Sequence, residues 1–169
     1  KGARCEIFIG DVSDPDACAA AVGQTVQRLG SLDVLVNNAG GGRLVAADQL
    51  SNEEWRHMQA INADGTFYMS REALRVMVAQ GRGAIVNMAS PVAEKGFPNT
   101  SAYSLVKGAI VTLTKSLSAE LGPKGVRVNA LAPGSVPTPG ALGLNDKAEY
   151  ERRTRTIPMR RLGREEDNA

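Results

Sequence analysis

The 169-residue chain carries 20 Lys and Arg against 18 Asp and Glu, and 43% of its residues are hydrophobic. This length and composition suit one globular domain with a sizeable core. A formal net charge of +2 gives no reason to expect nucleic acid or an anionic membrane as a partner. No apolar run approaches the roughly 20 residues of a membrane-spanning helix, and no secretion signal is visible. We therefore expect a cytoplasmic protein.

Candidate metal ligands are scarce. Cys5 and Cys18 lack the spacing of a metal or redox motif, which favours simple thiols in a reducing compartment. His57 is the only histidine and is expected at the surface. We expect no metal site.

Strand-like apolar runs alternate with helical patterns, which favours parallel βαβ units over a bundle or a sandwich. The first strand is predicted at residues 5–9. Ser13 or Asp14 can cap a helix over Pro15–Leu29, and Gly30 can end it.

The middle of the chain repeats this pattern. A short buried strand is predicted at residues 32–36 and another at 84–88. Between them, Ser51 and Glu54 form a capping box that opens one long helix over residues 52–79.

A third unit follows, with a helix over Ser101–Leu121 and a strand over Val126–Leu131 that is expected to be covered on both faces. Beyond it lie a Gly/Pro-rich loop and a charged stretch at residues 146–155, which we interpret as a lid or a subunit interface. Ligands bind at the carboxyl ends of parallel strands in such folds, so we expect the site in the loops that follow them.

Tyr103 and Lys107 stand four residues apart on a predicted helix, so their side chains share one face. An ammonium group near a phenol lowers the pKa of the phenol, which can then exchange a proton with an alcohol. The spacing alone is weak evidence, because a solvated helix face shows it by chance. Ser90 ends a strand thirteen residues earlier, where its hydroxyl can hold a carbonyl.

The segments NNAG, SAYSLVK and VRVNALAPG, in this order and spacing, resemble the short YxxxK-type branch of the short-chain dehydrogenase/reductase family. GDVSD and IPMRRLGREED are also similar to it, so the resemblance covers nearly the whole chain. It implies an α/β fold with a Rossmann-like, doubly wound parallel sheet. The overall pattern resembles 3-oxoacyl-[acyl-carrier-protein] reductases.

The resemblance also implies catalytic roles. Tyr103 would be the general acid/base, and Lys107 would bind the nicotinamide ribose and lower the pKa of the tyrosine. Ser90 would orient the reacting carbonyl. Asn62, in INADGTF, would hold a local helix distortion and a water linked to the lysine.

The implied cofactor is NAD or NADP, and the choice between them stays open. Besides Tyr103 and Lys107, the resemblance implies cofactor contacts from three segments. Asp11 and Val12 would lie at the adenine, and Asn38, Ala39 and Gly40 beside the adenosine ribose. The nicotinamide end would be met by Pro133, Gly134, Val136 and Thr138. Pro137 is less usual in that last loop.

The doubly wound strand order 3-2-1-4-5-6 makes the strand at residues 5–9 the third and that at 32–36 the fourth. We find no strand, Gly-rich turn and helix of the kind that holds a pyrophosphate. We therefore expect residues 1–169 to be one partial dinucleotide-binding domain without the first two strands and the last. By itself such a chain is expected to be marginally stable, prone to aggregation and inactive.

The leading hypothesis is an oxidoreductase that transfers a hydride between NAD(P) and a carbonyl/alcohol substrate. Sugar, polyol and steroid dehydrogenases share the motifs. The alternative is a non-catalytic NAD(P)-binding sensor or scaffold, which the joint presence of Asn62, Ser90, Tyr103 and Lys107 disfavours. An epimerase or dehydratase of the longer branch is disfavoured by NNAG. The two long helices resemble those that pair subunits, so a homotetramer, or a homodimer, is expected.

Overall fold

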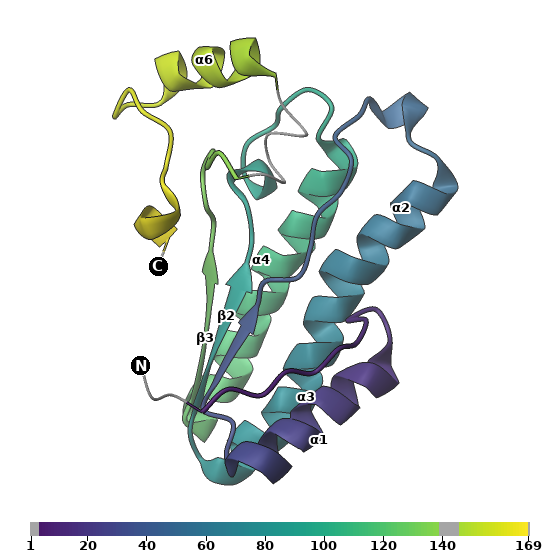
Figure 1. Ribbon diagram of the computed structural model, residues 1–169, viewed down its shortest axis with the longest axis vertical. Helices are drawn as coiled ribbons and strands as arrows, with labels where there is room; N and C mark the ends of the chain where they lie inside the picture. The colour runs from purple at the N-terminus through teal and green to yellow at the C-terminus, as the bar shows by residue number, and fades with distance from the viewer. Residues whose placement is uncertain (1–3, 139–145, 169) are drawn as a thin grey trace.

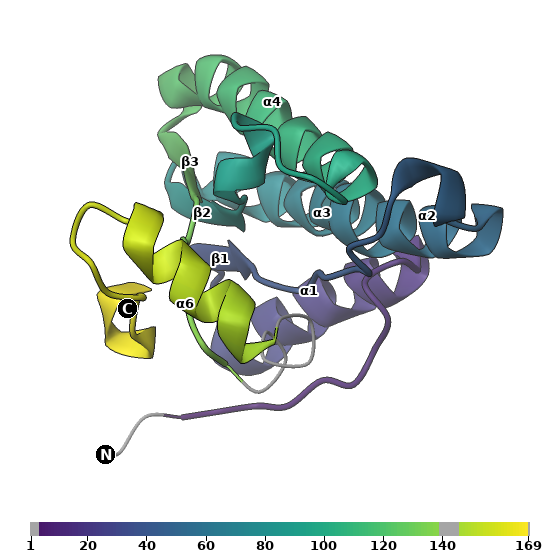
Figure 2. The same cartoon turned by 90° about the horizontal axis from the view of Figure 1, so that it is seen from above.

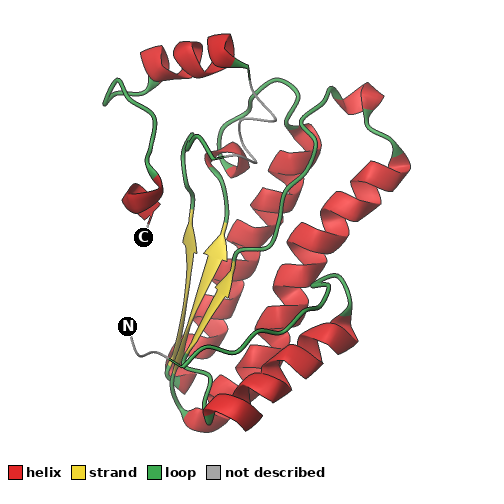
Figure 3. Ribbon diagram, in the orientation of Figure 1, coloured by secondary structure: helices red, strands yellow, loops and turns green. Residues whose placement is uncertain are grey.

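The computed structural model describes residues 4–138 and 146–168. Its sheet has three strands, β1 (Val34–Asn37), β2 (Gly83–Met88) and β3 (Val126–Leu131), in the order β1-β2-β3 (Figures 1 and 3). Both pairings are parallel. The predicted α/β architecture and the neighbour relations of these three strands are confirmed.

The crossover helices pack against one face of the sheet. Leu35, Ile85, Val126 and Val128 from the strands form one core with Ala73 and Met77 of α3 (Gly65–Gln80) and Leu121 of α4 (Ser101–Leu121). Helix α1 (Pro15–Leu29) lies on the far side of α3 from α4, as Figure 2 shows. The expectation that β3 is covered on both faces is wrong for the described chain, because its side chains alternate between buried and exposed.

The strand predicted at residues 5–9 does not form among the described residues. The segment is extended but pairs with no strand, and the side chains of Ile7 and Ile9 are 82% and 93% exposed. A strand needs a hydrogen-bonding neighbour, and the doubly wound order does not place this segment beside β1. Val34 and Val36 of β1 point to the uncovered face of the sheet and are half exposed.

The helix predicted over residues 52–79 is interrupted. It consists of α2 (Asn52–Gln59), a π-helical turn η2 (Ala60–Asp64) and α3. The capping box of Ser51 and Glu54 is present as predicted. The other predicted helices have the expected bounds, with Asp14 as the N-cap of α1.

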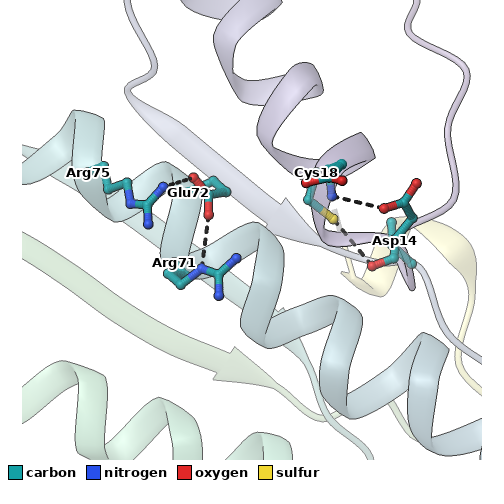
Figure 4. Close-up of polar contacts among 7 residues, drawn as sticks. Asp14, Cys18, Arg71, Glu72 and Arg75 are labelled. Atoms are coloured by element: carbon teal, nitrogen blue, oxygen red, sulfur yellow. Dashed lines mark hydrogen bonds and ion pairs between the residues drawn. The ribbon is translucent and has the colours of Figure 1, made fainter.

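Helix α1 packs against α3, and Figure 4 shows polar contacts made within each of these two regions. Glu72 of α3 is buried there, and its carboxylate accepts hydrogen bonds from Arg71 Nε at 2.9 Å and Arg75 Nη1 at 2.7 Å. Cys18 is buried on α1, and its thiol donates to the carbonyl oxygen of Val12 at 3.3 Å. The turn before α1 is thereby held against the helix that follows it.

The charged stretch after β3 forms helix α6 (Lys147–Thr156), which was not predicted. The chain then returns to the loop after β3, where Gly163 N donates to Ser135 O at 2.9 Å and Arg153 Nη1 donates to Ser135 Oγ at 3.1 Å. Within the described ranges, no helix has the length and apolar character needed to cross a membrane.

Candidate active site

The loops that end β1 and β2 lie next to the first turns of α4 (Figure 1). A short 3₁₀ turn η3 (Pro91–Ala93) follows β2 and packs against α4. Parallel strands all end at the same edge of the sheet, so the segments that contain Asn38, Ser90 and Tyr103 meet there.

Asn62 lies fully buried in the π turn. Its Nδ2 donates to Met58 O at 2.8 Å and to Gly41 O at 2.7 Å, and its Oδ1 accepts from Gly41 N at 3.2 Å. A π turn shifts the helical hydrogen-bond pattern by one residue and is common at functional sites. Here the distortion lets one amide side chain join the helix to the loop after β1.

Gly40 passes between two of the predicted catalytic side chains. A Cβ atom at this position would lie 2.6 Å from Asn62 Oδ1 and 3.3 Å from Lys107 Nζ. The backbone of the loop therefore approaches both groups as closely as a glycine allows. Asn38, Ala39 and Gly40 are exposed, so this backbone faces solvent at the end of β1.

Lys107 is 4% exposed, and its Nζ donates to the carbonyl oxygen of Met88 at 2.8 Å. The ammonium also lies 5.6 Å from the centroid of the Tyr103 ring. Burial disfavours the charged form and lowers the pKa of Lys107 to about 8.

Tyr103 differs from the prediction in one respect. Its pKa is raised, because the phenol is partly desolvated by burial. This direction is opposite to the lowering expected from Lys107, whose ammonium donates to Met88 O.

Ser90 is half-buried at the start of η3, two residues after Met88. Its Oγ accepts only a long hydrogen bond, 3.5 Å, from Val92 N. The hydroxyl hydrogen of Ser90 can therefore be directed toward a substrate oxygen without breaking a strong bond.

The predicted adenine-side residues form a tight turn. Asp11 Oδ1 accepts from both the backbone N and the Oγ of Ser13 at 2.8 Å, and these bonds lower the pKa of Asp11. Val12 packs against Gly65, where an added Cβ atom would lie 2.9 Å from Val12 Cγ2. The turn is thus fixed to α3, three residues beyond Asn62.

The predicted nicotinamide-side residues lie in the loop after β3. Thr138 N donates to Val136 O at 2.9 Å, and Gly163 packs against the Val136 side chain. Pro133 and Gly134 connect this loop to β3. The structure thus brings Gly40, Asn62, Tyr103 and Lys107 into one cluster, with the Asp11 turn and the loop after β3 in separate places.

Sequence reasoning missed a buried polar network beneath this cluster. Its side chains come from α3, β1, β2 and α4 and are Ser70, Asn37, Asn87 and Thr114. One of them, Asn87, lies inside the run predicted as a strand at residues 84–88, and Asn37 directly follows the run at residues 32–36. An amide in such a run was the available signal, since a buried polar group needs a partner.

Comparison with known proteins identifies the family. The family model described as enoyl-(acyl carrier protein) reductase matches residues 1–169. The inactive 2-(S)-hydroxypropyl-CoM dehydrogenase 2 of Xanthobacter autotrophicus is 40% identical over 164 residues, covering 94% of this chain and 71% of that protein. The chain belongs to the short-chain dehydrogenase/reductase family.

Two further relatives show how much of the length of a family member this chain covers. Oxidoreductase UcpA of Escherichia coli is 38% identical over 96% of this chain and 65% of its own. The structure of a gluconate 5-dehydrogenase from Burkholderia cenocepacia in complex with NADP and tartrate superimposes with a TM-score of 0.88 and 33% identity, over 92% of this chain and 61% of that one. The chain therefore spans about two thirds of the length of these short-chain dehydrogenase/reductase relatives.

Proposed function

We propose that this chain belongs to an NAD(P)-dependent dehydrogenase that interconverts a secondary alcohol and a ketone, with Tyr103 as general acid/base. One observation carries the proposal. The buried Lys107 ammonium lies between the Met88 carbonyl and the Gly40 backbone, beside the Tyr103 ring. A buried cation next to a phenol and an exposed glycine loop is an arrangement for proton transfer next to a bound ligand.

The residues present fit the nicotinamide-ribose part of such a cofactor. The loop at Gly40 has no room for a side chain, and its exposed backbone leaves space for a flat ligand. Lys107 would donate to the ribose hydroxyls, and Asp11 and Val12 would lie at the adenine. The loop from Pro133 to Thr138 would hold the carboxamide end. The cofactor, when bound, supplies or accepts the hydride.

The proton steps fall to this chain's own side chains. In ketone reduction Tyr103 Oη would give its proton to the developing alkoxide, and in alcohol oxidation it would take one. Ser90 Oγ would donate to the same oxygen and hold it in place. Lys107 would favour the phenolate once its ammonium turns toward the phenol, and Asn62 would keep the Gly40 loop in position.

The names of relatives support secondary alcohols as the substrate class. Both 2-hydroxypropyl-CoM and carbon 5 of gluconate carry a secondary hydroxyl. A 3-oxoacyl thioester is a ketone and fits the same chemistry, so a 3-oxoacyl-[acyl-carrier-protein] reductase stays within the proposal. Sugar, polyol and steroid substrates differ from it only in what surrounds the reacting carbon.

A non-catalytic NAD(P)-binding protein is the second candidate function. One relative, at 40% identity, carries the word inactive in its name. Against it, Asn62, Ser90, Tyr103 and Lys107 are all present here, and three of them lie around the same loop.

We also propose a cytoplasmic homotetramer, or homodimer. Helices α3 and α4 line a cavity of about 530 Å³ with Phe67, Leu74 and Val78 on one side and Leu117 and Leu121 on the other. Charged side chains also line it: Arg71, Arg75, Glu120 and Lys124. An apolar face of this kind on two long helices suits contact with a second copy.

The test is a steady-state screen of the full-length protein with NAD and NADP against secondary alcohols, ketones and matched primary alcohols. We expect turnover with at least one secondary alcohol or ketone and with one cofactor preferred. Binding of NADH or NADPH without any turnover would favour the sensor, and neither binding nor turnover would contradict both functions.

A further inference from the structure

Four buried polar side chains form one hydrogen-bonded network through the middle of the sheet. Asn37 Nδ2 on β1 donates to Ser70 Oγ on α3 at 2.9 Å and to Asn87 Oδ1 on β2 at 2.8 Å. Asn87 Nδ2 then donates to Thr114 Oγ1 on α4 at 2.9 Å. The network therefore joins two helices through two strands.

This network is fully satisfied. Ser70 and Asn87 are 1% and 0% exposed, and Thr114 is 7% exposed. The Thr114 hydroxyl accepts from Asn87 and donates to Ile110 O at 2.7 Å, so both its hydrogen-bonding functions are used. Among the described residues, no buried side-chain nitrogen or oxygen lacks a partner. Apolar side chains would fill this space without such requirements, whereas a satisfied polar network fixes one arrangement.

The network ends one residue from the candidate active site. Asn87 precedes Met88, whose carbonyl oxygen accepts from Lys107 Nζ. Thr114 lies seven residues after Lys107 and eleven after Tyr103, so all three side chains are on one face of α4. Helix α4 is thus bonded to the end of β2 at two successive points, which fixes both its rotation and its position along its axis.

We propose that Asn87 and Thr114 are positioning residues, which set where Tyr103 and Lys107 lie relative to the loops after β1 and β2. This inference rests on the proposed function, since it concerns the placing of the same proton-transfer pair. Neither residue touches a reacting atom. They act through Met88 and through the docking of α4.

A purely structural role predicts a different result. Thr114 lies about 16 Å along the helix from Tyr103. A local packing defect there would lower stability and leave the phenol in its surroundings. A docking defect would lift the first turns of α4 and expose Tyr103. Since burial raises the pKa of Tyr103, exposure would return that pKa toward its ordinary value.

The experiment compares three variants of the full-length protein. Thr114→Val removes the hydroxyl at constant shape, and Thr114→Ser keeps it. Thr112→Val is the matched control, because Thr112 is exposed on the same helix. Tyr103 ionisation is followed by ultraviolet absorbance, as the difference between each protein and the same protein with Tyr103→Phe. Where the parent shows turnover, kcat and KM are also measured.

We expect Thr114→Val to lower the Tyr103 titration midpoint by about half a pH unit or more and to reduce kcat by about tenfold or more with little change in KM. Thr114→Ser and Thr112→Val should keep the parent values. A folded Thr114→Val protein with an unchanged midpoint would overturn the proposal, whatever happens to its melting temperature.

Two remaining outcomes also decide whether Asn87 and Thr114 are positioning residues. If Thr114→Val does not fold, Thr114→Ala takes its place, because it leaves room for a water at Asn87. Failure of both to fold, with Thr114→Ser folded, would assign the network to stability alone and overturn the proposal. If the parent has no turnover, the proposed function fails, while the titration still decides for or against the positioning role.

Discussion

Strand β2 and the N-terminal segment at residues 5–9 are both short apolar runs, but only β2 pairs with other strands and is buried. Ile85 in β2 is 0% exposed, between two paired strands and under α3. Ile9 is 93% exposed in a segment without strand pairing. In this segment Glu6 Oε2 accepts a hydrogen bond from Arg28 Nη1 of α1 at 3.1 Å.

The difference shows what makes an apolar run into a strand. Side-chain preference selects extended backbone in both places, but the backbone hydrogen bonds and the apolar cover come from neighbours. Strand β1 lies between the two cases, with one edge paired to β2 and Val34 and Val36 half exposed on its uncovered face. The candidate active site lies at the carboxyl ends of β1 and β2, which pair with each other.

The largest expected effect comes from the same substitution, isoleucine to alanine, made once in β2 and once in the segment at residues 5–9. Ile85→Ala should lower the free energy of unfolding by about 2–5 kcal/mol, because it opens a cavity in the core. Ile9→Ala should change it by less than about 0.5 kcal/mol, as at other exposed positions. Chemical denaturation of both variants measures the difference. Equal losses would mean that the segment at residues 5–9 is packed in solution.

A smaller effect is expected at the border of the site. Gly40→Ala should cost about 1–3 kcal/mol and weaken nicotinamide cofactor binding, since its Cβ would press on Asn62 Oδ1 and Lys107 Nζ. Gly23→Ala is the control, in an exposed helical position with open space around it, and should stabilise by about 0.5–1 kcal/mol. Thermal melting and a binding titration measure both. Unchanged cofactor binding by Gly40→Ala would show that this loop does not contact the cofactor.

The smallest effect concerns pH. Burial lowers the pKa of Lys107 to about 8, against 10.5 for the free side chain. Between these values the unfolded chain binds more protons than the folded one, so stability rises with pH in this window. The melting temperature of the parent relative to Lys107→Met should therefore rise by a few degrees from pH 8 to pH 10.

The control for this prediction is Lys115→Met, because Lys115 is exposed on the same helix. Its difference from the parent should stay flat over the same pH range. If the difference in melting temperature between the parent and Lys107→Met also stays flat, burial does not lower the pKa of Lys107.

Much of this fold could be predicted from the sequence because its signals are local. Caps fixed both ends of α1 and the start of α2, and the bounds of α4 and β3 follow from their patterns. The strand at residues 5–9 was wrong because pairing is not local. The break at Ala60–Asp64 has no local signal in the helix pattern and was expected only through a family resemblance.

The candidate site divides in the same way. Its spacing on α4 and the glycine at position 40 are visible in the sequence, and the structure brings them together. The direction of the Tyr103 pKa shift was not predictable, because it depends on how deeply the fold buries the phenol. Asn87 and Thr114 lie far apart in sequence, so their contact was equally hidden.

The most direct test of the proposed chemistry is Tyr103→Phe in the full-length protein, with Tyr68→Phe as the matched control. We expect Tyr103→Phe to bind the nicotinamide cofactor as the parent does and to lose at least about a hundredfold in kcat. Tyr68→Phe should keep both. Turnover by Tyr103→Phe at the parent rate would contradict the assignment of Tyr103 as the general acid/base.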